Sequence, residues 1–233
     1  SGADYAKIGV GRSTGTKLIS ASGHIKNPGV YEIELGLSVY EFMNSDEYLG
    51  GMSSDRPLKA FVPGGSSVPI LPANLIYKTA AGEDRLMTYE SLSDGGFATG
   101  SMLGSGGFIV YNDTSCIVRN TWNFSRFYHH ESCGQCTPCR EGTGWLEKVL
   151  HRIENGHGRE EDIDLLLSIQ SKIEGNTICP LGDAASWPVA AAIRHFRDEF
   201  EYHIRFPEKI KNRDHFVAEP FEQVKHLVGK VTV

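Results

Sequence analysis

Two features that this 233-residue sequence lacks narrow its possible functions: a long apolar run and an excess of basic residues. The longest apolar stretch is Trp187–Ile193, which contains Pro188, whereas a helix that spans a bilayer needs roughly 20 apolar residues. The net charge is −6, and binding to nucleic-acid phosphates requires clustered Lys and Arg. We therefore expect no direct membrane insertion and no nucleic-acid partner.

Cysteine is also scarce, at five residues, and the first ten residues contain no basic segment followed by an apolar stretch. No secretory signal is therefore visible. An odd number of cysteines in such a chain favours a reducing compartment, where clustered cysteines indicate metal binding rather than disulfides. The hydrophobic content of 40% is ample for one large or two small domains.

The first half of the chain is rich in Gly, Pro and Ser, and its short alternating patterns predict strands. The expected strands are residues 17–20, 30–35, 58–62 and 75–77. A helix is expected at residues 38–48, capped by Ser38 and ended by Gly50 and Gly51. A hairpin, a helix and further strands follow one another in the order of a ubiquitin-like β-grasp domain.

From about residue 110 the spacing of apolar residues predicts four amphipathic helices. Asp113 or Thr114 is expected to cap the first, and the fourth is expected to begin near Ala184. Gly156 and Gly175 mark the ends of the second and third helices. The buried faces are expected to include Ile117, Phe124, Phe127, Tyr128, Trp145, Leu146, Val149, Leu150, Ile153, Ile163, Leu166, Leu167, Ile173, Val189, Ile193, Phe196 and Phe200. Such helices pack as a bundle, so the expected fold class is α+β, with a β-grasp domain followed by a four-helix bundle.

Three of the five cysteines, Cys133, Cys136 and Cys139, have C-x2-C-x2-C spacing. This spacing is typical of [4Fe–4S] sites, which need a fourth thiolate from elsewhere, whereas zinc usually receives two separated C-x2-C pairs. The helical bundle can bring Cys179, at the start of the fourth predicted helix, back beside the other three. The sequence therefore predicts a [4Fe–4S] cluster held by these four cysteines, with structural zinc as the alternative.

Other candidates near the motif have simpler interpretations. Arg140 is expected to be a solvated charge that raises the reduction potential of an adjacent anionic cluster. Cys116 is interpreted as a small buried apolar residue rather than as a ligand or redox switch. His129 and His130 are interpreted as helix-end residues, because four cysteines already complete the cluster.

Two Gly-rich stretches, residues 63–67 and 104–107, match neither the dinucleotide-binding G-x-G-x-x-G pattern nor a P-loop. We interpret both as turns between strands. No Ser/His/Asp arrangement or carboxylate pair stands out, so no catalytic residue is assigned.

The residues around the cysteines resemble one family. The segment Glu131–Gly142, with the sequence ESCGQCTPCREG, and the segment Thr177–Asp183, with the sequence TICPLGD, are similar to the NADH-binding flavoprotein subunit of respiratory complex I. The same module occurs in diaphorase subunits of NAD(P)-linked hydrogenases and formate dehydrogenases. The resemblance extends over nearly the whole chain to about residue 205.

This resemblance implies a subunit in three parts: a flavin and nicotinamide domain, a soluble-ligand-binding (SLBB) β-grasp domain and a helical bundle with one [4Fe–4S] cluster. By position, Cys133, Cys136, Cys139 and Cys179 are the implied ligands. Pro180 and Leu181 are implied to lie near the flavin, although the family usually has Ala where Pro180 stands. The implied domains are residues 1–16 as a linker from a preceding flavin domain, 17–108 as the β-grasp domain, 109–206 as the bundle and 207–233 as a tail.

The family also implies an activity, one-electron transfer from reduced flavin to downstream iron–sulfur clusters in NADH:quinone oxidoreductase. Its implied partners are the thioredoxin-like [2Fe–2S] subunit and the large iron–sulfur subunit, in a peripheral arm on the cytoplasmic or matrix side of a membrane. No segment of the chain replaces the Gly-rich flavin domain, so FMN and NADH are expected only in a missing N-terminal domain. No ferredoxin-like cysteines follow Cys179, which favours the complex I type over the diaphorases. The alternative is a non-redox interaction module whose cysteines hold zinc or an inert cluster.

Overall fold

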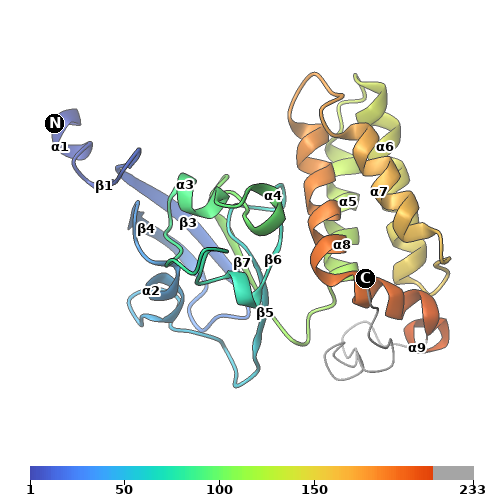
Figure 1. Cartoon of the computed structure of the whole chain (residues 1–233), viewed down its shortest axis with the longest axis horizontal. Helices are drawn as coiled ribbons and strands as arrows, with labels where there is room; N and C mark the ends of the chain where they lie inside the picture. The colour runs from blue at the N-terminus through green and yellow to red at the C-terminus, as the bar shows by residue number, and fades with distance from the viewer. Residues whose placement is uncertain (212–233) are drawn as a thin grey trace. The chain divides into compact units, whose positions relative to one another are not determined.

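The computed structural model describes residues 1–211. Its contacts divide the chain into a sheet unit, Ser1–Asp113, and a helical unit that begins at Thr114 (Figure 1). The boundary expected between residues 108 and 109 falls inside strand β7 (Gly107–Asn112), so the division lies a few residues later. Of the tail expected at 207–233, only the short helix α9 (Pro207–Lys211) is described, and the rest lies outside the described residues.

Among the described residues, the sheet unit contains one five-stranded sheet with the order β4-β3-β7-β5-β6. Its strands are β3 (Thr16–Gly23), β4 (Gly29–Glu34), β5 (Leu58–Val62), β6 (Leu71–Pro72) and β7 (Gly107–Asn112). The central pair, β3 and β7, is parallel, and every other pairing is antiparallel. With its mixed sheet and separate helices, the fold is α+β, as the sequence predicts.

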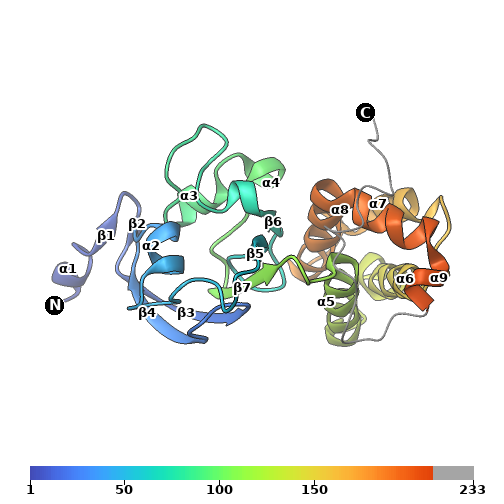
Figure 2. The ribbon, with the colours of Figure 1, turned by 90° about the horizontal axis from the view of Figure 1, so that it is seen from below.

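Helix α2 (Val39–Asn44) covers one face of this sheet (Figure 2). Ser38 caps it as expected, because the Ser38 side chain accepts a hydrogen bond from the Tyr40 N–H. The ring of Phe42 meets that of Phe108 on β7 edge to face, with centroids 5.3 Å apart, and both side chains are fully buried. The unit also contains short elements: α1 (Gly2–Tyr5), β1 (Gly9–Val10), β2 (Ser13–Thr14), η1 (Ala73–Leu75), α3 (Tyr89–Ser93) and α4 (Gly96–Thr99).

Two local predictions in this unit are wrong. Residues 75–77 do not form the expected strand, and Leu75 is the last residue of the 3-10 turn η1. This turn follows β6 directly, because Pro72 has no N–H to continue the ladder of that strand. The helix expected to reach Tyr48 ends at Asn44. There Ser45 is extended and its side chain accepts a hydrogen bond from the Glu47 N–H, which begins a turn instead of another helical turn.

The two Gly-rich stretches are loops beside strands, as expected, and they lie against each other. The Gly65 N–H donates to the Gly107 carbonyl at 2.7 Å, and the Ser105 N–H donates to the Gly64 carbonyl at 3.0 Å. A Cβ on Gly104 would lie 2.4 Å from the Gly64 carbonyl oxygen, so glycine at 104 allows the two stretches to approach so closely.

Within the described residues, the helical unit consists of four long helices followed by α9 (Figure 2). The long helices are α5 (Ile117–Glu131), α6 (Thr137–Glu154), α7 (Asp162–Ile173) and α8 (Leu181–Arg205). Asn155 and Gly156 end α6, and Gly175 follows α7, as the sequence predicts. The expected buried stripe of α8 is confirmed, since Val189, Ile193, Phe196 and Phe200 are all at most 7% exposed.

Two aromatic residues expected on buried faces are exposed instead. Phe127 is 51% and Trp145 53% exposed. On α5 the buried stripe includes Thr121 and Ser125, so polar side chains occupy core positions and Phe127 falls off the stripe. The expected caps are also wrong, because Cys116 and not Asp113 or Thr114 precedes α5 as its N-cap. No helix in the described part of the chain is both long enough and apolar enough to cross a membrane.

Arg85 provides a test of how the sheet unit is stabilised. Its guanidinium is fully buried and donates hydrogen bonds to the carbonyl oxygens of Ser91, Leu92 and Thr99. Arg85→Leu removes these three hydrogen bonds from a charged donor, so we expect a loss of about 3 kcal/mol of unfolding free energy. Hydrogen exchange of amides in β3 and β7 measures this loss, with the exposed Arg12→Leu as a control that should change it by less than about 0.5 kcal/mol. Equal protection of these amides in both variants would contradict a stabilising role for the Arg85 guanidinium.

Asp162 provides a test in the helical unit. Burial raises the pKa of this carboxyl, but hydrogen bonds from the Arg152 side chain and the Arg159 N–H outweigh burial, and the pKa is lowered overall. A lowered pKa means that Asp162 stabilises the fold fully above about pH 5 and that this contribution is lost as the pH falls below about 4. Asp162→Asn should therefore cost about 2 kcal/mol at pH 7 and flatten the decrease in stability between pH 5 and pH 3. Urea unfolding followed by helical circular dichroism at each pH measures both effects. If stability falls equally steeply from pH 5 to pH 3 in the variant and the parent, the pH dependence does not come from Asp162.

Candidate metal centre

The C-x2-C-x2-C motif lies where α5 ends and α6 begins. Cys133 follows the C-cap of α5, Cys136 is the N-cap of α6, and Cys139 lies in its first turn with Pro138. Proline is favoured there because the first turn needs no N–H from it. Gly134 turns the chain with a φ of +79°, and its N–H donates to the Ser132 hydroxyl at 3.4 Å. The short connection therefore keeps all three thiols at the N-terminus of one helix.

Cys179 lies in the loop between α7 and α8, directly before the first turn of α8. The Thr177 hydroxyl donates to the Cys179 carbonyl at 2.9 Å, and the Gly175 N–H donates to the Asp183 carboxylate at 2.7 Å. Gly182 allows this turn, since a Cβ there would lie within about 3.0 Å of three atoms of Thr177. These contacts hold the loop over the start of α8.

One hydrogen bond joins the two cysteine segments. The N–H of Ile178, the residue before Cys179, donates to the Cys136 sulfur at 3.4 Å. The fold thus brings the segment of the fourth cysteine beside the motif, which is the arrangement that the sequence predicts. Sequence analysis did not assign this role to Ile178, because a backbone donor carries no side-chain signature.

The surroundings of these thiols suit an anionic inorganic cluster. The N-termini of α6 and α8 both face the cysteine segments, and the positive end of a helix dipole stabilises negative charge. Cys139 is buried and its sulfur lies 3.2 Å from the Ser132 hydroxyl, whereas Cys133 and Cys179 are exposed. Four thiols with N–H and hydroxyl contacts to sulfur form a donor set that fits a [4Fe–4S] cluster.

Comparison with known proteins also points to an iron–sulfur site. Residues 119–203 match the family model described as the NADH-ubiquinone oxidoreductase-F iron-sulfur binding region. The F subunit of NADH-quinone oxidoreductase in Rickettsia typhi is 44% identical over 209 residues, and that of Mycobacterium bovis is 43% identical over 200 residues. Residues 119–203 of this chain are therefore similar to the iron–sulfur region of these F subunits. The family resemblance and the expected [4Fe–4S] cluster are thereby confirmed.

The similarity to the F subunits extends well beyond that segment. It covers 89% of this chain but only 45% of the Rickettsia typhi protein, and 86% of this chain but 42% of the Mycobacterium bovis protein. The chain therefore spans about half the length of such relatives.

Solved structures of an NAD+-reducing [NiFe]-hydrogenase are also similar. In the air-oxidized state the match has a TM-score of 0.71 and 27% identity, and it covers 87% of this chain and 32% of that chain. In the H2-reduced state the TM-score is 0.70 and the identity 25%, over 99% of this chain and 36% of that chain.

Arg140, His129 and His130, the charged or titratable candidates near the motif, each contact a neighbouring polar group. Arg140 is half-exposed and donates from Nη1 to the Gly134 carbonyl at 3.0 Å, so its charge is held beside the cysteine loop. His129 and His130 lie in the last turn of α5, as expected, and their Nδ1 atoms contact Glu147 and Glu131 at 2.9 and 3.0 Å.

Three other expectations can be placed in the structure. Pro180 is the exposed N-cap of α8 and Leu181 its half-buried first residue, directly after Cys179. The interpretation of Cys116 as a small apolar residue is wrong, because its half-buried sulfur lies among polar side chains. No local pattern reveals this, since its neighbours come from helices α6 and α8.

Gly182 tests how tightly the fourth cysteine is held. In Gly182→Ala the new methyl group must displace Thr177, which contacts the Cys179 carbonyl. We expect a loss of about 1–3 kcal/mol of stability, typical of overpacking, and a lower iron content than in the parent protein. Iron analysis and thermal melting of anaerobically purified protein measure the two effects. An iron content and a melting temperature equal to those of the parent protein would show that the loop adapts without moving Cys179.

Proposed function

We propose that this chain transfers single electrons from a reduced flavin to downstream iron–sulfur clusters through one [4Fe–4S] cluster. Its ligands are Cys133, Cys136, Cys139 and Cys179. The observation that carries the proposal is the Ile178 N–H to Cys136 sulfur bond, which joins two cysteine segments that are far apart in the sequence. When bound, the cluster accepts one electron at a time, which a two-electron hydride carrier needs.

The chain's own residues contribute orientation and electrostatics. The helices α5, α6 and α8 fix the thiols, and the Ile178 N–H and the two helix N-termini stabilise negative charge on sulfur. Arg140, held to the Gly134 carbonyl, adds a positive charge that raises the reduction potential. These groups favour the reduced, more negative form of the site.

The architecture supports the same assignment. We propose that the sheet unit is a soluble-ligand-binding β-grasp domain, because its first and last long strands, β3 and β7, are parallel neighbours at the centre and α2 covers one face. The helical unit is then a four-helix bundle. The domains are a linker at 1–16, the β-grasp domain from 17 to about 113, the bundle to 206 and a tail at 207–233.

FMN and NADH belong, in this proposal, to the part of the F-subunit relatives that the chain does not cover. Pro180 and Leu181 lie nearest the flavin because they follow Cys179 directly and Pro180 is exposed. The parent protein is then an NADH:quinone oxidoreductase in a peripheral arm, on the cytoplasmic or matrix side of its membrane. The hydrogenase likeness makes a diaphorase the second candidate, and the first is favoured by the higher identity to the F subunits.

The partners proposed are the thioredoxin-like [2Fe–2S] subunit and the large iron–sulfur subunit. Apolar side chains beside the cysteine segments are available to them, since Ile178 is 86% and Trp145 53% exposed. Trp145 lines a groove of about 630 Å³ between α6 and α7 that begins at Thr137 and Pro138.

Substitution of single cysteines tests the ligand set. We expect Cys179→Ala to lose most of the roughly four irons and four sulfides that the parent binds and to lower the melting temperature, because the cluster links α8 to the cysteine loop. Cys116→Ala is the matched control and should keep the iron. Iron and acid-labile sulfide of anaerobically purified protein, with spectra before and after dithionite, measure the outcome. Zinc that persists after anaerobic reconstitution would instead identify a structural module.

A further inference from the structure

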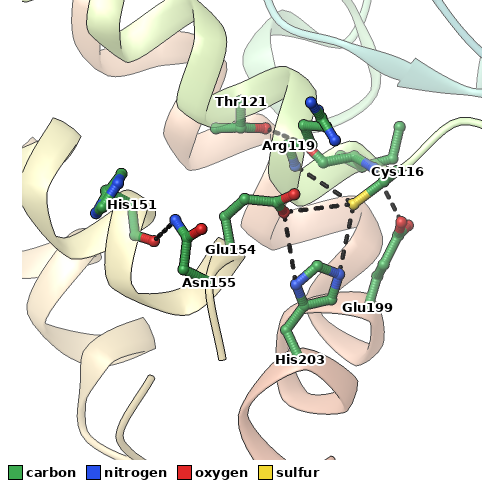
Figure 3. A network of polar contacts seen from close by, with 9 residues as sticks. Cys116, Arg119, Thr121, His151, Glu154, Asn155, Glu199 and His203 are labelled. Atoms are coloured by element: carbon green, nitrogen blue, oxygen red, sulfur yellow. Dashed lines mark hydrogen bonds and ion pairs between the residues drawn. The ribbon is translucent and has the colours of Figure 1, made fainter. Parts of the chain in front are cut away.

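A second polar cluster lies at the other ends of the helices that carry the cysteine motif (Figure 3). Cys116 is the N-cap of α5, Glu154 is the last residue of α6, and His203 lies in the last turn of α8. We call these three residues the thiol–imidazole cluster. Cys139 and Glu154 lie near opposite ends of α6, so at 1.5 Å per residue the two sites are about 22 Å apart.

The contacts in this cluster form a triangle. The Cys116 thiol donates to Glu154 Oε2 at 3.8 Å, and its sulfur lies 3.4 Å from His203 Nε2. The other ring nitrogen of His203, Nδ1, lies 3.6 Å from the same carboxylate oxygen. The two nitrogens of the ring therefore face different partners, the thiol and the carboxylate. One ligand atom from each of the three residues lies within 4.8 Å of the others, which is close enough to hold a metal ion. The contact between Nε2 and the sulfur also allows a proton to pass between the thiol and the ring.

The start of α5 adds a further stabilising contact for a thiolate. The Arg119 N–H, three residues along the helix, donates to the Cys116 sulfur at 3.4 Å. Thiolates are stabilised at helix N-termini and beside an imidazolium. A nucleophile next to a base that a third group orients is the usual arrangement of an activated thiol.

The charged and titratable groups around the thiol come from all three helices. Glu154 belongs to α6, Glu199 and His203 belong to α8, and Arg119 belongs to α5. Glu199 accepts a hydrogen bond from the Ile117 N–H at 2.9 Å, beside the thiol. The side chains of Glu154 and His203 are at least nine-tenths buried, and Cys116 is only half-buried. A carboxylate beside the ring favours a protonated imidazole, and as a like charge it opposes a thiolate, so the imidazolium and the Arg119 N–H are the groups that would stabilise the sulfur anion.

We propose that Cys116 is a modification site, a thiolate paired with the His203 imidazolium and oriented through Glu154, that reacts with small electrophiles and peroxides. With iodoacetamide the sulfur forms an S–C bond, the C–I bond breaks, iodide leaves, and the proton stays on His203. With hydrogen peroxide an S–O bond forms and the O–O bond breaks. Sulfur is then oxidised to the sulfenic acid, and the peroxide is reduced to water with the proton from His203.

Alkylation of the cluster-loaded protein tests the proposal independently of electron transfer. Labelling of Cys116 by iodoacetamide is followed by peptide mass spectrometry from pH 5 to pH 10, with the urea-unfolded chain as a reference. We expect the native labelling rate to rise with an inflection at least one pH unit below the value of about 8.5 for an unperturbed thiol. An inflection at or above that of the unfolded chain would overturn the proposal, whatever the variants show.

Three variants distinguish activation of the Cys116 thiol by His203 from simple solvent exposure of that thiol. His203→Gln should move the inflection upward by at least one pH unit and slow labelling at pH 6.5 by about threefold or more, because the thiolate fraction falls faster than the nucleophilicity rises. Glu154→Gln should shift the inflection of the labelling rate by less than His203→Gln does. His195→Gln, another α8 histidine, is the matched control and should leave it unchanged. Iron content and helical circular dichroism verify that each variant keeps its fold.

Two further measurements decide between oxidation and metal binding. Hydrogen peroxide followed by dimedone should label Cys116 in the parent protein and several-fold less in His203→Gln. If Cys116 reacts only after a chelator removes about one zinc per chain while the cluster iron stays, the three residues form a metal site and the proposal is wrong.

Discussion

The hydrogen bond from the Ile178 N–H to the Cys136 sulfur is the contact on which the candidate metal centre depends. The motif between α5 and α6 supplies three thiols, and this contact brings the segment of a fourth beside them. The loop before α8 reaches this position because Gly182 leaves room for Thr177 and because Asp183 accepts a hydrogen bond from the Gly175 N–H. Small backbone requirements in one loop therefore help to place the Cys179 segment beside the motif.

The same helices place cysteine thiols at both ends of the helical unit. At one end the N-termini of α6 and α8 face the four cysteines, which suits an anionic cluster. At the other end the C-termini of α6 and α8 bring Glu154 and His203 to Cys116 at the start of α5. Helix direction thus explains both sites: thiols lie at helix N-termini, and the histidine lies in the last turn of a helix, where a positive charge is favoured.

The sheet unit is organised differently, around a central parallel pair and one covering helix. Phe42 and Phe108 meet at the centre of this core, while the buried Arg85 guanidinium donates to backbone carbonyls of the α3–α4 segment. A buried charged donor in this role is costly to remove, because its hydrogen bonds are lost together. The loops at 63–67 and 104–107 approach so closely that glycine is required there.

The sequence by itself determined the features that depend on local spacing. Periodicity located α5 to α8 and most strands, and the C-x2-C-x2-C spacing identified the candidate metal ligands of the motif, because both patterns are properties of a few neighbouring residues. Tertiary structure decided the rest. Which face of α5 is buried, and hence the exposure of Phe127, depends on polar core positions such as Ser125. The surroundings of Cys116 depend on residues from two other helices, which no local pattern can connect.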